Sequence, residues 1–146
     1  EDISETTSAK VQTMYKIIGE LESLGDSGEA ISRILSRKNI HRKSFDAATT
    51  KKLEEMADAV DIAYSTMIEN LEAAHKGQLV DITNAYNAEE HINSLRNILR
   101  DTEIEELEND GKNYQTSVYY MDIVNELERM GDFIINISQD LKRSFT

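Results

Sequence analysis

Apolar residues recur along this chain at alternating spacings of three and four, which is the pattern of helices that bury one stripe of side chains. Four long stretches carry such a seam, over about 5–37, 45–77, 79–108 and the residues that follow 111. The first seam consists of Met14, Ile17, Leu21, Leu24, Gly28, Ile31 and Leu35. These seams predict four helices, each roughly 45 Å long at a rise of 1.5 Å per residue.

Short polar connections separate the four stretches. Ser44 or Asp46 can cap the second helix, Gly77 can end it, and an Asn-Asp-Gly turn at 109–111 precedes the fourth helix. Short connections force consecutive helices to run antiparallel. The sequence therefore predicts an all-α fold, an antiparallel up-down-up-down four-helix bundle that forms a single domain over 1–146.

Charge and composition narrow the chemistry. The chain has 28 acidic and 16 basic residues and a net charge of -12, which disfavours nucleic acid and favours cations or basic partners. It contains no cysteine, so disulfides and thiolate nucleophiles are excluded. No apolar run approaches the roughly 18 residues of a membrane span. No phosphate-binding loop or nucleophilic triad pattern follows a strand, and we predict that the chain is not an enzyme.

One segment occurs twice in the sequence. Residues 14–35 and 120–141 are identical at nine of 22 aligned positions, and both contain the pattern Glu-Leu-Glu-x-x-Gly-Asp. A helical core explains the repeated apolar residues. It does not require the three repeated carboxylates or a glycine in the interior of a helix. The repeat therefore indicates a role beyond simple packing.

The repeated carboxylates are candidate metal ligands. Acids four residues apart lie on one face of a helix about 6 Å apart, where they can bind a hard divalent cation through oxygen. The third helix offers an acid and an amide at the same spacing. The candidate ligands are Glu128, Asp132, Glu22, Asp26, Glu89 and Asn93. The alternative is that these side chains are ordinary solvated surface.

The second copy of the motif, Glu126-Leu-Glu-Arg-Met-Gly-Asp132 followed by Phe-Ile-Ile-Asn136-Ile, resembles the signature helix of the PhoU family of phosphate-transport regulators. The first copy, at 20–26, is similar to the signature helix of a preceding repeat, and the third helix is similar to the family's middle helix. The resemblance implies one signature helix at 5–37 followed by a three-helix repeat at 45–146. It also implies clusters that bind iron, manganese or magnesium, and no known catalysis.

The resemblance leads to an expected function. The missing initiating methionine and the incomplete first repeat suggest a piece of a longer protein, most similar to the cytoplasmic C-terminal domain of bacterial sodium/phosphate cotransporters. Such a domain would lie at the cytoplasmic face of the membrane. Its partner would be the membrane part of the transporter or a transporter-associated protein, and a homo-oligomer stays open.

Other functional classes stay open beside this expectation. A free-standing phosphate-uptake regulator would share the same motifs. A ferritin-like metal enzyme would need the spacing Glu-x-x-His on two helices, and the chain offers it once, at Glu72 and His75. A plain helical scaffold, in which the repeated acids are only surface, is the remaining alternative.

Overall fold

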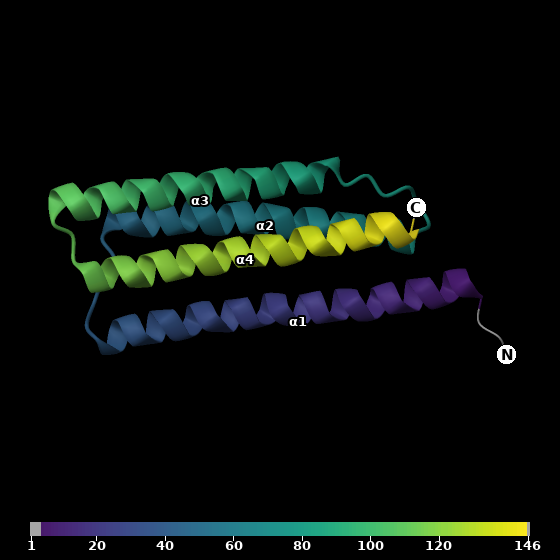
Figure 1. The fold of residues 1–146 in the computed structure, drawn as a ribbon, viewed down its shortest axis with the longest axis horizontal. Coiled ribbons are helices and arrows are strands. Elements are labelled where there is room, and N and C mark those ends of the chain that lie inside the picture. The colour runs from purple at the N-terminus through teal and green to yellow at the C-terminus, as the bar shows by residue number, and fades with distance from the viewer. Residues whose placement is uncertain (1–3, 146) are drawn as a thin grey trace.

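A computed structural model describes residues 4–145, and this part of the chain forms four α-helices and no strand. The helices are α1 (Glu5–Ile40), α2 (Ala47–His75), α3 (Thr83–Asp110) and α4 (Tyr114–Phe145). Each helix runs antiparallel to the one before it, and all four lie along one long axis (Figure 1). This arrangement confirms the predicted all-α, up-down-up-down bundle.

Local chemistry sets the helix boundaries. Asp46 is the cap of α2, because its Oδ1 accepts a hydrogen bond of 2.7 Å from the backbone N–H of Thr49. Gly77 and Gly111 follow the ends of α2 and α3 with φ of +69° and +63°, in the left-handed region that favours glycine. Both turns were predicted from the sequence.

The third helix begins later than predicted. We expected it from Leu79, whereas α3 starts at Thr83. Val80 and Ile82 are instead buried from the non-helical link, and the Asp81 carboxylate accepts hydrogen bonds from the backbone and side chain of Thr83. The link stays outside the helix because Val80 and Ile82 are buried from it and because the Asp81 carboxylate holds Thr83.

The four helices are not equivalent neighbours. α4 contacts each of the other three helices, and α2 also contacts α3. Helices α2, α3 and α4 therefore form a compact unit in which each contacts the other two. In the described part of the chain, no Cα atom of α1 lies within 8 Å of one from α2 or α3. α1 therefore packs against α4 alone and lies on one flank of the bundle (Figure 1).

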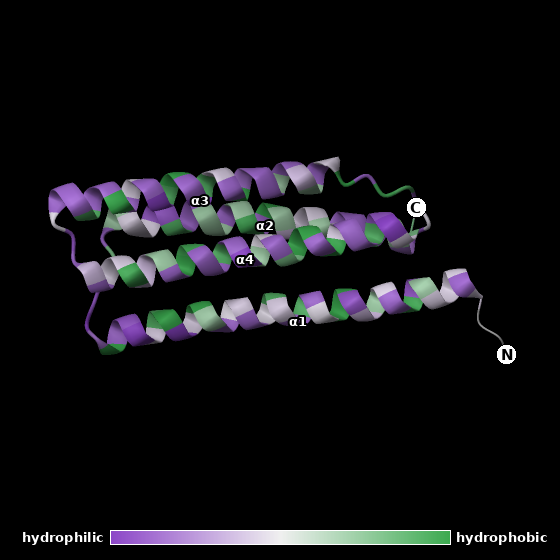
Figure 2. Ribbon diagram, viewed as in Figure 1, coloured by the Kyte–Doolittle hydropathy of each residue, from purple (hydrophilic) through white to green (hydrophobic). Residues whose placement is uncertain are grey.

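The one-sided packing of α1 changes the expected core. Ile17 and Leu24 are buried against the bundle, but Met14, Leu21 and Leu35 of the same predicted seam are exposed. A helix with one neighbour can cover only one side of a broad apolar stripe, which is why these residues are not core. Figure 2 shows hydrophobic residues distributed along α1, whereas the visible face of α3 is mostly hydrophilic.

Candidate functional site

The second copy of the repeated motif faces α3. The ion pair Arg96–Glu128 links the two helices, with 2.7 Å between Nε of Arg96 and Oε2 of Glu128. Both side chains are half-buried. The carboxylate of Glu128, one of the predicted metal ligands, thus already has a cationic partner from within the chain.

A second group of polar side chains lies beside this ion pair. Partial burial raises the pKa of Glu89 above its ordinary value, the nearby Asp132 carboxylate raises it further, and a hydrogen bond from the Asn93 amide opposes the rise. Loss of hydration also raises the pKa of Asp132, against the opposing charges of Arg96 and Arg129. The structure therefore brings the predicted ligands Glu89, Asn93 and Asp132 together at the contact of α3 with α4.

We define the α3–α4 cluster as Glu89, Asn93 and Asp132. Its side chains offer oxygen donors for a cation. Two carboxylates and an amide oxygen fit a hydrated hard divalent cation, because magnesium-like ions keep several waters and need only one or two carboxylates. Over residues 4–145, however, no group of three or more His, Cys, Asp or Glu side chains is arranged to hold a metal ion. Two carboxylates and one amide could supply only part of the shell of such an ion, and water would have to supply the rest.

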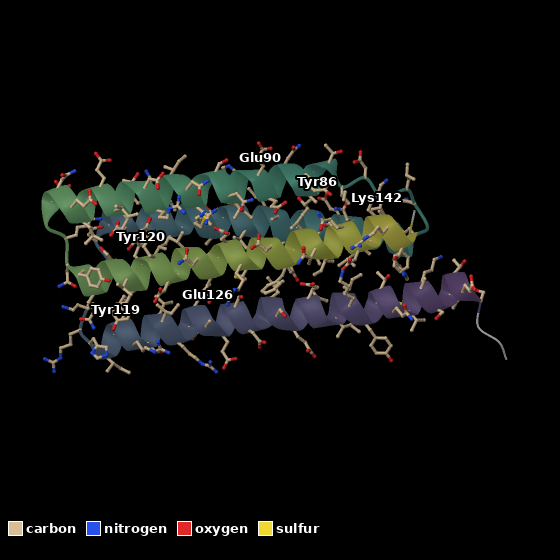
Figure 3. The ribbon with its side chains drawn as sticks, viewed as in Figure 1. Tyr86, Glu90, Tyr119, Tyr120, Glu126 and Lys142 are labelled. Carbon is tan, nitrogen blue, oxygen red and sulfur yellow. The ribbon has the colours of Figure 1, made fainter. Side chains whose placement is uncertain are left out.

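The first copy of the motif has a different environment. Glu22 and Asp26 are exposed on α1, and α4 is the only helix of the described chain that contacts α1. Asp26 borders a hollow of about 220 Å³ between α1 and α4, which Glu126 and Arg129 of α4 also line. Figure 3 labels Glu126 on the side of α4 that faces α1. Because α1 does not contact α3, the six predicted ligands do not form one site.

The repeated glycines also differ. A Cβ at Gly131 would lie 3.0 Å from Cδ1 of Ile92, so the glycine lets α3 approach α4 closely. A Cβ at Gly25 would meet nothing within 4 Å, apart from its chain neighbours and the nearby backbone of its own helix. Glycine costs about 1 kcal/mol relative to alanine inside a helix, and only Gly131 has an internal packing reason for it.

The sequence analysis identified Glu89 but missed Arg96 and Glu103, which lie on the same face of α3. Glu89, Arg96 and Glu103 follow one another at intervals of seven, so they share one face of the helix. Glu103 is buried, accepts a hydrogen bond of 2.6 Å from Oγ of Ser117, and pairs with Lys112 at 3.1 Å. The heptad spacing of these residues was the signal that could have identified them.

The pair proposed for a ferritin-like enzyme has no supporting arrangement. Glu72 and His75 are exposed in the last turn of α2. Neither belongs to a metal-binding group among the described residues. Over residues 4–145, no helix has a stretch that is both apolar and long enough to span a membrane.

Together, the fold and the site define a class of protein: a helical-bundle domain that carries a repeated acidic motif on its helix faces. A family model described as the PhoU domain matches residues 53–141, which cover most of α2 and all of α3. The match includes more than half of the chain, so the chain belongs to the PhoU domain family. This family is regulatory, non-enzymatic and associated with phosphate transport. Comparisons with curated proteins and with solved structures find no match.

Proposed function

We propose that this chain regulates a phosphate transporter from the cytoplasmic face of the membrane, as the PhoU-like domain of a sodium/phosphate cotransporter. The observation that carries this proposal is the PhoU domain match across α2, α3 and α4. The second copy of the signature motif lies within that match, on α4. The partner is the membrane part of the transporter, and a free-standing regulator of phosphate uptake is the second candidate.

Phosphate uptake by cells tests this function. Uptake would be measured at low and high external phosphate, with and without a sodium gradient, in cells that carry or lack the chain. We expect loss of the chain to change how uptake responds to external phosphate, and only when sodium is present. A change that is independent of sodium would favour the free-standing regulator. Uptake that is the same in both strains under all conditions would contradict a role in phosphate transport.

We propose in addition that the α3–α4 cluster binds a divalent cation, either iron, manganese or magnesium. Support comes from geometry and charge together: Glu89 is half-buried on α3, and the carboxylate of Asp132, which is exposed on α4, lies near enough to raise its pKa. A bound cation would offset their mutual repulsion, with the Asn93 amide as a neutral third donor. Because the donors come from two helices, binding would strengthen the contact between α3 and α4.

The first copy of the motif is the weaker candidate for a cation. Glu22 and Asp26 have no acid and amide pair from a second helix beside them. Ala30 also stands where the second copy has Asn136. A cation there would rely on two carboxylates of one helix and water, whereas the second copy has Glu89 and Asn93 of α3 beside Asp132, so we assign the cation to the second copy.

A further inference from the structure

The link between α1 and α2 concentrates positive charge on a strongly acidic chain. This link lies at the end of the bundle opposite both chain termini (Figure 1). Residues 33–45 contain no aspartate or glutamate, and they hold five basic residues, which are Arg33, Arg37, Lys38, Arg42 and Lys43. The whole chain has a net charge of -12. This end can therefore approach an anionic surface that would repel the acidic faces of the bundle.

Two of the five cations are used within the chain. The ammonium group of Lys38 donates a hydrogen bond of 3.3 Å to the backbone carbonyl of Lys43 and lies 5.0 Å from the ring centre of Phe45. Arg33 pairs with Glu29 at 2.6 Å on the exposed side of α1. Lys38 thus holds the shape of the link, and other side chains are left to contact a ligand.

The remaining cations lie around an exposed apolar side chain. Arg42 and Lys43 belong to none of the ion pairs within residues 4–145, and Arg37 borders acids of α4 without pairing with them. Ile40, the last residue of α1, is 75% exposed. We define the basic tip as Ile40, Arg42 and Lys43. Cations beside an exposed apolar side chain are typical of segments that bind anionic lipid surfaces.

The backbone at Arg42 is an independent indication of a ligand. Arg42 has a φ of +55°, in the left-handed region that disfavours side chains. Its N–H donates to the carbonyl of Asn39, and the next N–H donates to that of Lys38. Gly77 closes α2 with the same pair of bonds, and Gly111 is the left-handed residue after α3. Only α1 has a side chain at this position, which stability alone does not favour.

We propose that the basic tip binds the anionic headgroups of a lipid membrane. Arg42 and Lys43 would lie beside the headgroup phosphates, and Ile40 would enter the boundary with the acyl chains. The proposal rests on the proposed function for the location at a membrane, and it names the surface of the chain that meets the lipid. Acids at the same end, such as Asp110, lie on α3, which does not contact α1. Binding would therefore tilt the α1 side of the bundle toward the lipid.

Ile40 distinguishes a lipid surface from other anionic ligands. A free phosphate ion would contact only the cations and would leave Ile40 in water. An acidic peptide would offer carboxylates without an apolar layer. A lipid surface offers anionic groups and an apolar layer together. Repulsion from the acids elsewhere on the chain is screened beyond about 8 Å at physiological salt, so the contacting end decides the interaction.

Sedimentation with lipid vesicles tests the proposal. Vesicles of phosphatidylcholine alone are compared with vesicles in which roughly one third of the lipid is phosphatidylserine. A chelator is present, so that no divalent cation links the acidic faces to the lipid. The variants are Arg42→Gly and Ile40→Ser, and the matched controls at the opposite end of the bundle are Lys76→Gly and Leu79→Ser. Lys76 is exposed, and Leu79 is 80% exposed, so the controls remove the same kinds of side chain.

We expect the wild-type chain to sediment with phosphatidylserine vesicles at millimolar lipid, but not with phosphatidylcholine alone, and less as salt rises. Arg42→Gly should weaken binding about fivefold, the usual effect of one basic residue at an anionic surface. It should not lower the melting temperature, because glycine fits the left-handed position better. Ile40→Ser should also weaken binding, and both controls should bind as wild type does.

Three results would overturn the proposal: no sedimentation at millimolar lipid, equal sedimentation with both vesicles, or the same loss in the controls. Binding to a glutamate-rich peptide but not to vesicles would overturn it as well, because the ligand would then be an acidic protein. A chain that changes phosphate uptake without binding vesicles would exclude the basic tip and leave the proposed function intact. A chain that binds vesicles without changing uptake would support the basic tip and contradict that function.

Discussion

Replacing Lys112 with methionine is expected to lower the free energy of unfolding by about 3–5 kcal/mol, the usual effect of removing one partner from a buried ion pair. The side chain of Glu103 is only 3% exposed, and Nζ of Lys112 lies 3.1 Å from its Oε2. Lys112 also pairs with Glu106. Without the ammonium group, the Glu103 carboxylate would stay buried beside a second acid, with Ser117 as its hydrogen-bond donor.

Urea denaturation measures this effect. The matched control is Lys51→Met, which makes the same replacement at an exposed position near the start of α2 and should change stability by less than about 0.5 kcal/mol. Adding Glu103→Leu to Lys112→Met should recover part of the loss, because the buried charge is then removed as well. A loss below about 1 kcal/mol in Lys112→Met would show that Glu103 is not held as a buried carboxylate.

The same substitution at the two repeated glycines is expected to have opposite effects. Gly131→Leu should lower the free energy of unfolding by about 1–3 kcal/mol or more, because even its Cβ would lie 3.0 Å from Ile92. Gly25→Leu should raise stability by up to about 1 kcal/mol, since the side chain enters open space and leucine favours a helix.

Chemical denaturation of both variants beside wild type makes this comparison. The two positions occupy the same place in the repeated motif and receive the same side chain, so each variant is the control for the other. Equal changes in stability would contradict the different packing that the structure shows at the two copies. A loss at Gly25 alone would mean that α1, and not α4, has the closely packed neighbour.

The sequence predicts the number, direction and approximate limits of the helices because each helix has its own apolar period and a turn at its end. It does not predict which helices touch. The apolar spacing around Leu21 is compatible with one neighbouring helix or with two. In the described chain only α4 contacts α1. Likewise, Val80 and Ile82 fit a helical period, but they are buried from a link that Asp81 and Thr83 hold outside α3.

The candidate site was predictable in part. Spacing of four placed Glu89 with Asn93 and Glu128 with Asp132 on single helix faces, and the α3–α4 contact brings three of these residues together. Spacing along one helix cannot show which residue lies opposite on another. Arg96, the partner of Glu128, was missed for this reason. In addition, basic side chains are not metal ligands and were not considered for the site.

A thermal melt with added cations tests whether the second copy of the motif together with α3 forms the cation site. The samples are wild type, Glu89→Gln with Asp132→Asn, and Glu22→Gln with Asp26→Asn, each with manganese, magnesium or ferrous iron and with a chelator. An ion that binds only the folded chain stabilises it by about 2.7 kcal/mol at 100 times its dissociation constant. We predict that at least one ion raises the melting temperature of wild type and of the Glu22 and Asp26 variant, but not of the Glu89 and Asp132 variant. No shift in wild type, or a shift that only the Glu22 and Asp26 variant loses, would show that the second copy and α3 do not form a cation site.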